Sequence, residues 1–230
     1  MNFDDFTLDP PGSIAVVGAG PLGIEAALYG RFLGYNVTLM EAKEVGHSMA
    51  KLVDDPFPMM PHQCLSSLAV AALQAQSSET IPLELPISYR DWIDRGLMGL
   101  VQCDLLAGRL RTESQVTRIS RVAPEPASAE AAEDDEDVPP DFRLSITTKD
   151  APVESMDVES LVLAVGAAPD LTETGIELDF PLPAPYLFRI GETVTNDLAK
   201  DLDRGRRQIT ALFAHLGGRA DLDLYRPRRV

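Results

Sequence analysis

Three glycines near the N-terminus have the spacing G-x-G-x-x-G, at Gly18, Gly20 and Gly23. They follow a short apolar run, Ile14–Val17, and precede a helical pattern, so we expect a strand, a tight turn and a helix. In such a unit the first glycine makes the turn, the second lets a pyrophosphate approach the backbone, and the third lets the helix pack against the strand. The helix N-terminus adds free N–H groups and a positive dipole end. The turn therefore predicts a dinucleotide site formed by Gly18, Ala19, Gly20, Pro21, Leu22 and Gly23.

A second predicted strand, Val37–Met40, ends at an acidic residue. Glu41 lies eighteen positions after Gly23, where a carboxylate accepts hydrogen bonds from the hydroxyls of an adenosine ribose. A carboxylate there repels a 2′-phosphate, which favours FAD or NAD over NADP. We therefore place Glu41 and Ala42 in the cofactor site. The alternative is a unit of this type without a ligand, but three glycines in one turn cost backbone entropy that ligand-free packing does not need.

Other segments must extend and cover this unit. The candidate strands Gln115–Val122 and Phe142–Thr148 predict a small β-meander, since apolar and polar residues alternate in the second. Covering helices are expected at Leu65–Leu73, after a capping box that begins at Ser88, at Leu97–Leu106, and from Gly205 to Gly217. The predicted fold class is α/β: a single Rossmann-like FAD/NAD(P)-binding domain over residues 1–230, with a parallel sheet, a small β-meander and covering helices.

Composition excludes some classes of function. Among the 230 residues, 36 acidic side chains against 20 Lys and Arg give a formal net charge of -16, which disfavours nucleic acid and anionic membranes as partners. No stretch approaches the roughly 20 apolar residues of a membrane span. The N-terminus is acidic and lacks the basic region of a signal peptide, so a cytoplasmic location is expected.

Half of the net charge lies in one segment. Residues 123–141 contain eight acidic side chains and no basic one, and such a segment repels itself and cannot be buried, so we predict a disordered acidic loop. The alternative is an acidic arm that contacts a basic partner. Residues 226–230 are predicted to form a loose basic tail.

The cysteines and histidines predict no reactive site. Cys64 and Cys103 are far apart and form no C-x-x-C motif, so two buried free thiols are favoured over a disulfide, and no metal site is expected. His47 and His62 are candidate acid–base groups, but loop or packing roles are favoured because no partner residue is identifiable by spacing. No catalytic residue is identified.

The stretch GAGPLGIEAALY at residues 18–29 resembles the FAD-binding N-terminus of the two-dinucleotide-binding flavoproteins. Residues 161–170, with Gly166, resemble a strand-plus-glycine segment of that family, although Val165 stands where threonine is usual. Residues 186–192 resemble its last strand and flavin turn, at Gly191 and Glu192, with glutamate in place of aspartate. The resemblance also implies that a helix beginning at Gly205 approaches the pyrimidine side of the flavin.

Within that superfamily the chain most resembles bacterial FAD-dependent oxidoreductases of the flavin monooxygenase and lysine N-oxygenase-like type. It differs by having no second G-x-G-x-x-G for NAD(P)H, so the resemblance implies a short form without the NAD(P)H domain. This predicts an FAD-binding, oxidoreductase-like flavoprotein that takes electrons from a redox partner protein. The alternatives are a non-catalytic dinucleotide-binding or regulatory module, and an NAD-binding protein with a single Rossmann unit.

Overall fold

The computed structural model describes residues 7–76, 81–122, 141–149, 151–167, 171–195 and 197–226. Its strands are β1 (Ser13–Val17), β2 (Asn36–Met40), β3 (Leu110–Arg111), β4 (Ser114–Val122), β5 (Asp141–Thr148), β6 (Glu154–Val158), β7 (Ser160–Leu163), β8 (Glu177–Leu178) and β9 (Leu187–Arg189). Its main helices are α1 (Pro21–Phe32), α3 (Ser67–Ala75) and α6 (Leu198–Leu216). Shorter helical segments are η2 (His47–Leu52), α2 (Pro61–Cys64), α4 (Tyr89–Asp91), η3 (Trp92–Leu97), α5 (Met98–Val101) and η5 (Leu171–Thr174).

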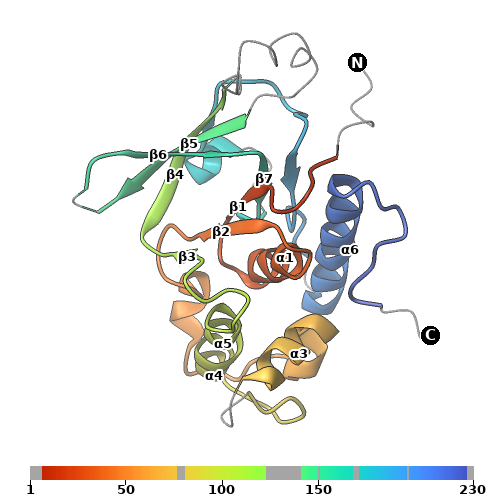
Figure 1. Ribbon diagram of the computed structural model, residues 1–230. Coiled ribbons are helices and arrows are strands. Elements are labelled where there is room, and N and C mark those ends of the chain that lie inside the picture. Colours follow the sequence, from red (N-terminus) through yellow and green to blue (C-terminus); the bar gives the residue numbers. More distant parts are fainter. Residues whose placement is uncertain are drawn as a thin grey trace.

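The strands form two sheets (Figure 1). The first has five parallel strands in the order β3-β2-β1-β7-β9, and α1 connects its neighbouring strands β1 and β2. The second has the order β6-β5-β4-β8, with antiparallel pairing except between β4 and β8. The predicted α/β fold, with a Rossmann-type parallel sheet and a small second sheet, is confirmed; the sequence had indicated only β4 and β5 of the second sheet.

The two faces of β1 show how the layers pack. Ile14 and Val16 belong to the core that includes the helices α1, α3 and α6, whereas Ala15 and Val17 belong to the core shared with the second sheet. All four side chains are almost fully buried, as expected for a strand covered on both faces. The parallel sheet is therefore the middle of three layers, with helices on one face and the second sheet on the other.

Helix α6 packs against α1 through aromatic and aliphatic side chains. The ring of Phe213 stacks on that of Tyr29, with centroids 5.0 Å apart, and Ile209 and Leu216 are fully buried on the same face. The helix begins at an Asp197 N-cap, whose side chain accepts a hydrogen bond from the Lys200 N–H at 3.1 Å. It ends at Gly217, as predicted.

The structure corrects several expected boundaries. Gly205 does not begin a helix; it lies inside α6, because the Asp197 N-cap starts that helix earlier. The expected helix at Leu97–Leu106 ends at Val101 in α5, and turns follow it. The capping box at Ser88 and the helix near Leu65–Leu73 are confirmed.

Parts of the predicted loop and tail lie outside the described residues. Of the acidic segment 123–141, only Asp141 is described, and it is the first residue of β5. Of the basic tail, only Arg226 is described; its backbone N–H donates to the Asp223 carboxylate at 3.2 Å.

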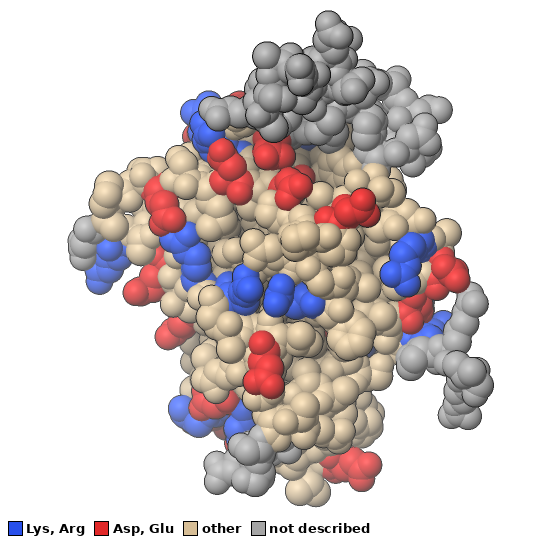
Figure 2. Space-filling model, in the orientation of Figure 1, with Lys and Arg blue, Asp and Glu red and all other residues tan. Residues whose placement is uncertain are grey.

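Several surface arginines pair with carboxylates, and both acidic and basic side chains lie on the face shown in Figure 2. The shorter pairs join Arg111 to Glu154 at 2.5 Å, Arg143 to Asp157 at 2.6 Å, and Arg90 to Asp54 at 2.8 Å. Within the described part of the chain, no helix is both long and apolar enough to cross a membrane.

Candidate functional site

A cavity of about 720 Å³ lies where four parallel strands end. Much of its lining comes from the residues that follow the carboxyl ends of β1, β2, β7 and β9. Ligands of open parallel sheets bind at this edge, because helix N-termini and loops converge there. Ten of the twelve predicted cofactor residues line the cavity: Gly18, Ala19, Gly20, Pro21, Leu22, Gly23, Glu41, Ala42, Gly166 and Gly191.

Gly18 makes the turn out of β1. Its backbone φ is 103°, a left-handed conformation that favours glycine, and a Cβ there would lie 2.4 Å from the Ala164 carbonyl oxygen. Its N–H donates to the Met40 carbonyl at 2.7 Å, which joins the turn to the end of β2. The first glycine is therefore needed both for its conformation and for the close approach of β7.

Gly20 and Gly23 differ in their surroundings. A Cβ at Gly23 would lie 1.9 Å from the Gly18 carbonyl oxygen, so this glycine lets α1 pack against the turn. A Cβ at Gly20 would meet no heavy atom within 4 Å. Open space beside Gly20, at the N-terminus of α1, is what close approach of a phosphate requires.

Glu41 fixes the glycine turn, residues 18–23, relative to β2. Its carboxylate accepts hydrogen bonds from the Ala19 N–H at 2.8 Å and from the Lys43 N–H at 3.1 Å. A carboxylate oxygen has two lone pairs, so both oxygens keep acceptor capacity for a ligand hydroxyl. The predicted acidic residue therefore lies at the cavity and is oriented by backbone donors.

The far side of the cavity is formed by loops after β7 and β9. Gly166 and Gly191 have φ values of 81° and 67°, and the Gly191 N–H donates to Gln208 of α6 at 3.0 Å. The start of α6 contributes Leu198 and Asp201 to the lining. Asp201 accepts hydrogen bonds from Thr195, so this helix end is held by the chain's own carboxylates.

Two predicted residues lie elsewhere. Glu192 lines a neighbouring groove, with its carboxylate 3.5 Å from Nε of Arg189. Gly205 is buried in the middle of α6, where a Cβ would lie 2.3 Å from Leu22 Cδ1. It allows α6 to approach the first turn of α1, so α6 packs behind the glycine turn.

Other elements also supply lining that the sequence analysis did not assign to the cofactor site, although it named His47 as a candidate acid–base group. Ser114, Gln115 and Val116 come from β4 of the second sheet, and His47 and Met49 come from η2. His47 Nε2 lies 3.0 Å from Lys43 Nζ and Nδ1 lies 3.6 Å from Glu44, at the exposed edge of the cavity. Nothing in the local sequence places β4 there; the Gly46–His47 turn soon after Glu41 was the one available signal.

A buried carboxylate holds the helices behind the cavity together. Glu25, two residues after Gly23, is 3% exposed. It accepts hydrogen bonds from the Ser66 N–H at 2.9 Å and the Ser66 hydroxyl at 2.6 Å, and Arg206 Nη2 lies 3.8 Å away. Burial raises the pKa of Glu25, against the opposing effects of Ser66 and Arg206. This cluster ties α1 to α3 and α6, and an acidic residue within an otherwise apolar helix was its sequence signal.

Two polar atoms of the same cluster are buried without a hydrogen-bond partner among the described residues. They are Arg206 Nε and the Tyr225 hydroxyl. Although that hydroxyl has no partner of good geometry, it lies near enough to Glu25 for the two groups to influence each other's pKa. The cysteines are free and buried, as predicted.

No family profile and no curated protein matches this chain. Among solved structures, it is similar to the bacillithiol disulfide reductase Bdr (YpdA) from Bacillus cereus, at 14% identity and a TM-score of 0.48, over 67% of this chain and 40% of that one. It is also similar to cyclohexanone monooxygenase, at 18% identity and a TM-score of 0.47, over 68% and 26% of the two chains. A complex of OTEMO with FAD and NADP shows 18% identity and a TM-score of 0.46, over 71% and 27%.

The matched region is therefore less than half of each of these proteins. Similarity at this level of identity and TM-score concerns the fold and supports no function or ligand for this chain.

Proposed function

We propose that this chain binds FAD and forms the FAD-binding part of an oxidoreductase-like flavoprotein. The observation that carries the proposal is the cavity at the ends of the parallel strands, where the space beside Gly20 is open and Glu41 stands at the end of β2. These two features match the pyrophosphate and the ribose of a dinucleotide.

Each part of the cavity suits one part of the ligand. The backbone of residues 18–23 and the N-terminus of α1 would hold the pyrophosphate, and Glu41 would accept hydrogen bonds from the ribose, with Ala42 beside it. Gly166 and Gly191 bound the far side, where the resemblance at residues 161–170 and 186–192 implies a flavin. That far side favours FAD over NAD.

Bound flavin would supply the redox chemistry, and the chain's own residues would bind it and orient it. We further propose that residues 1–230 hold the FAD-binding part alone, so that electrons come from another domain or a redox partner protein. The narrower resemblance to lysine N-oxygenase-like enzymes and the cytoplasmic location stay predictions.

Calorimetric titration with FAD tests the proposal. The purified protein, stripped of bound nucleotide, is titrated with FAD, and separately with NAD and ADP, by calorimetry. We expect FAD to bind with 1:1 stoichiometry and more tightly than NAD. Failure to bind FAD at all, from a folded protein, would overturn the proposal.

A second candidate is a non-catalytic nucleotide-binding module. The observation that favours it is that Glu192 and Gly205, both assigned to the flavin end by the resemblance, do not line the cavity. In that case the flavin half contributes nothing, and ADP binds as tightly as FAD. Tighter binding of FAD than of ADP would instead favour the flavoprotein.

A further inference from the structure

Arg31 and Arg109 are bonded to the adjacent residues Tyr35 and Asn36, and neither has an acidic partner among the described residues. In a chain of net charge -16, neither guanidinium has a carboxylate within 4.0 Å among the described residues, in contrast to the ion pairs of Arg111 and Arg143. Basic side chains gather in the middle of the face in Figure 2, over β3, β2 and α1. The two arginines come from the loop before β3 and from the last turn of α1.

Neutral oxygens hold both guanidinium groups in place. Arg31 donates from Nε to the Leu105 carbonyl at 3.1 Å and from Nη1 to the Tyr35 carbonyl at 2.6 Å. Arg109 donates from Nη1 to Asn36 Oδ1 at 2.6 Å. Since Tyr35 and Asn36 are adjacent, one turn of backbone orients both arginines. A guanidinium has five N–H donors, so each arginine keeps donors for a ligand.

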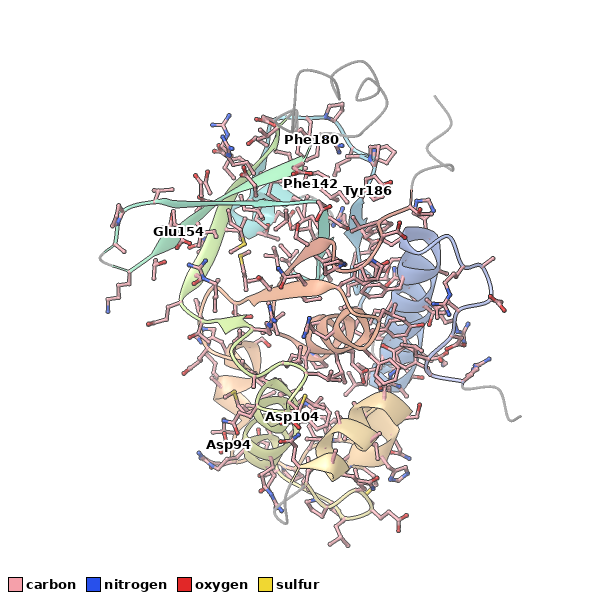
Figure 3. All side chains as sticks on the ribbon, in the orientation of Figure 1. Asp94, Asp104, Phe142, Glu154, Phe180 and Tyr186 are labelled. Carbon is pink, nitrogen blue, oxygen red and sulfur yellow. The ribbon has the colours of Figure 1, made fainter. Side chains whose placement is uncertain are left out.

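The positive charges of Arg31 and Arg109 repel each other. Burial, and in second place the charge of Arg109, lower the pKa of Arg31. A cation in the last turn of α1 suits the helix dipole, which accounts for Arg31 but not for a second guanidinium beside it. The nearby Asp104 is exposed beside α5 (Figure 3) and makes no ion pair with either arginine among the described residues.

We propose that Arg31 and Arg109 bind a phosphate group at a site separate from the nucleotide cavity. Two guanidinium groups carry two positive charges and several preset donors, which match a phosphate dianion better than a single carboxylate. The site lies at the opposite end of α1 from the glycine turn, about 15 Å away at 1.5 Å per residue. One dinucleotide phosphate therefore cannot serve both sites, and the ligand is free phosphate or a phosphate monoester.

Titration by NMR tests the proposal at the level of single side chains. The full chain, labelled with 15N, is titrated with inorganic phosphate and, in a second arm, with glycerol phosphate, each at constant ionic strength against chloride. We expect the Nε–H signals of Arg31 and Arg109 to shift and saturate with phosphate but not with chloride. Glycerol phosphate binding as tightly as the free ion identifies a monoester as an acceptable ligand, and weaker binding restricts the site to phosphate itself.

The variant Arg109→Gln removes one cation and leaves the bonds from Arg31 to Leu105 and Tyr35 intact. We expect it to weaken phosphate binding about tenfold or more, because a charge-assisted contact is lost. The matched control is Arg118→Gln, which removes the same charge from an exposed position on β4 and should leave binding unchanged. Equal affinity in R109Q and R118Q, or equal shifts with chloride, would overturn the proposal.

Discussion

Replacing Gly20 with alanine should separate ligand binding from folding. A Cβ at Gly20 meets no heavy atom within 4 Å, and the backbone φ of -73° suits any L-amino acid. Two small effects on stability oppose each other. Alanine is a poorer N-cap than glycine, but it lowers the conformational entropy of the unfolded chain, which raises the free energy of unfolding by about 0.4–1 kcal/mol. We expect the free energy of unfolding of G20A to stay within about 1 kcal/mol of the parent.

Ligand binding should respond differently. Gly20 lines the cavity, so the added methyl group occupies space that a pyrophosphate needs beside the N-terminus of α1. Loss of one charge-assisted contact to phosphate costs about 1.5–3 kcal/mol. We therefore expect the affinity of G20A for FAD to fall at least about tenfold, since 1.4 kcal/mol corresponds to that factor.

Gly23→Ala is the matched variant, with the same added methyl group three residues further on. Its Cβ would lie 1.9 Å from the Gly18 carbonyl oxygen, and a backbone oxygen cannot rotate away as a side chain can. Overpacking of this kind costs about 1–3 kcal/mol or more. G23A should therefore lose stability together with FAD affinity.

Urea unfolding followed by the fluorescence of the buried Trp92, and calorimetric titration with FAD, measure the two quantities for each variant. If G20A binds FAD as tightly as the parent does, the open space beside Gly20 is not where a pyrophosphate lies. If G20A loses as much stability as G23A, the steric reasoning is wrong for both.

Three further predictions concern the buried groups behind the cavity. Arg206→Met leaves the Glu25 carboxylate buried without its cation and should lower the free energy of unfolding by about 3–5 kcal/mol in urea titration; a loss below 1 kcal/mol would show that the ion pair adds little. Burial raises the pKa of Glu25 above 4.5, so the folded state binds that proton more readily than the unfolded chain does. The free energy of unfolding of the parent, relative to that of Glu25→Gln, should therefore fall as pH rises from 4.5 through the raised pKa. A difference that is flat or rises with pH contradicts this prediction. Burial raises the pKa of Cys64 from 9.0 to about 11, so its thiolate fraction at pH 8 is about a hundredfold below that of an ordinary thiol, and mass spectrometry should find it alkylated only after unfolding.

The β-α-β unit could be predicted because its signals are local. A buried strand, a turn that requires glycine and a largely apolar helix are each encoded within a few residues. The residues that the pattern singled out, Gly18, Gly20, Gly23 and Glu41, line one cavity. Caps such as Ser88 were predictable for the same reason, since a side chain bonds a backbone group three residues away.

The errors concerned elements whose limits depend on partners distant in sequence. Gly205 looks like a helix boundary, because glycine is a weak helix former. The structure keeps it inside α6 because a larger residue there would collide with Leu22 of α1. Glu192 was assigned by resemblance, but its carboxylate turns to Arg189.

The sequence by itself determined the glycine turn, the parallel β-α-β unit and the acidic residue at the end of β2, because their signals lie close together in the chain. Only the tertiary structure decided that β4 lines the same cavity, that Glu25 meets Ser66 and Arg206, and that Arg109 bonds to Asn36. Those contacts join residues that are 41 to 181 positions apart, and they form only when burial of the two cores brings the sheets and helices together.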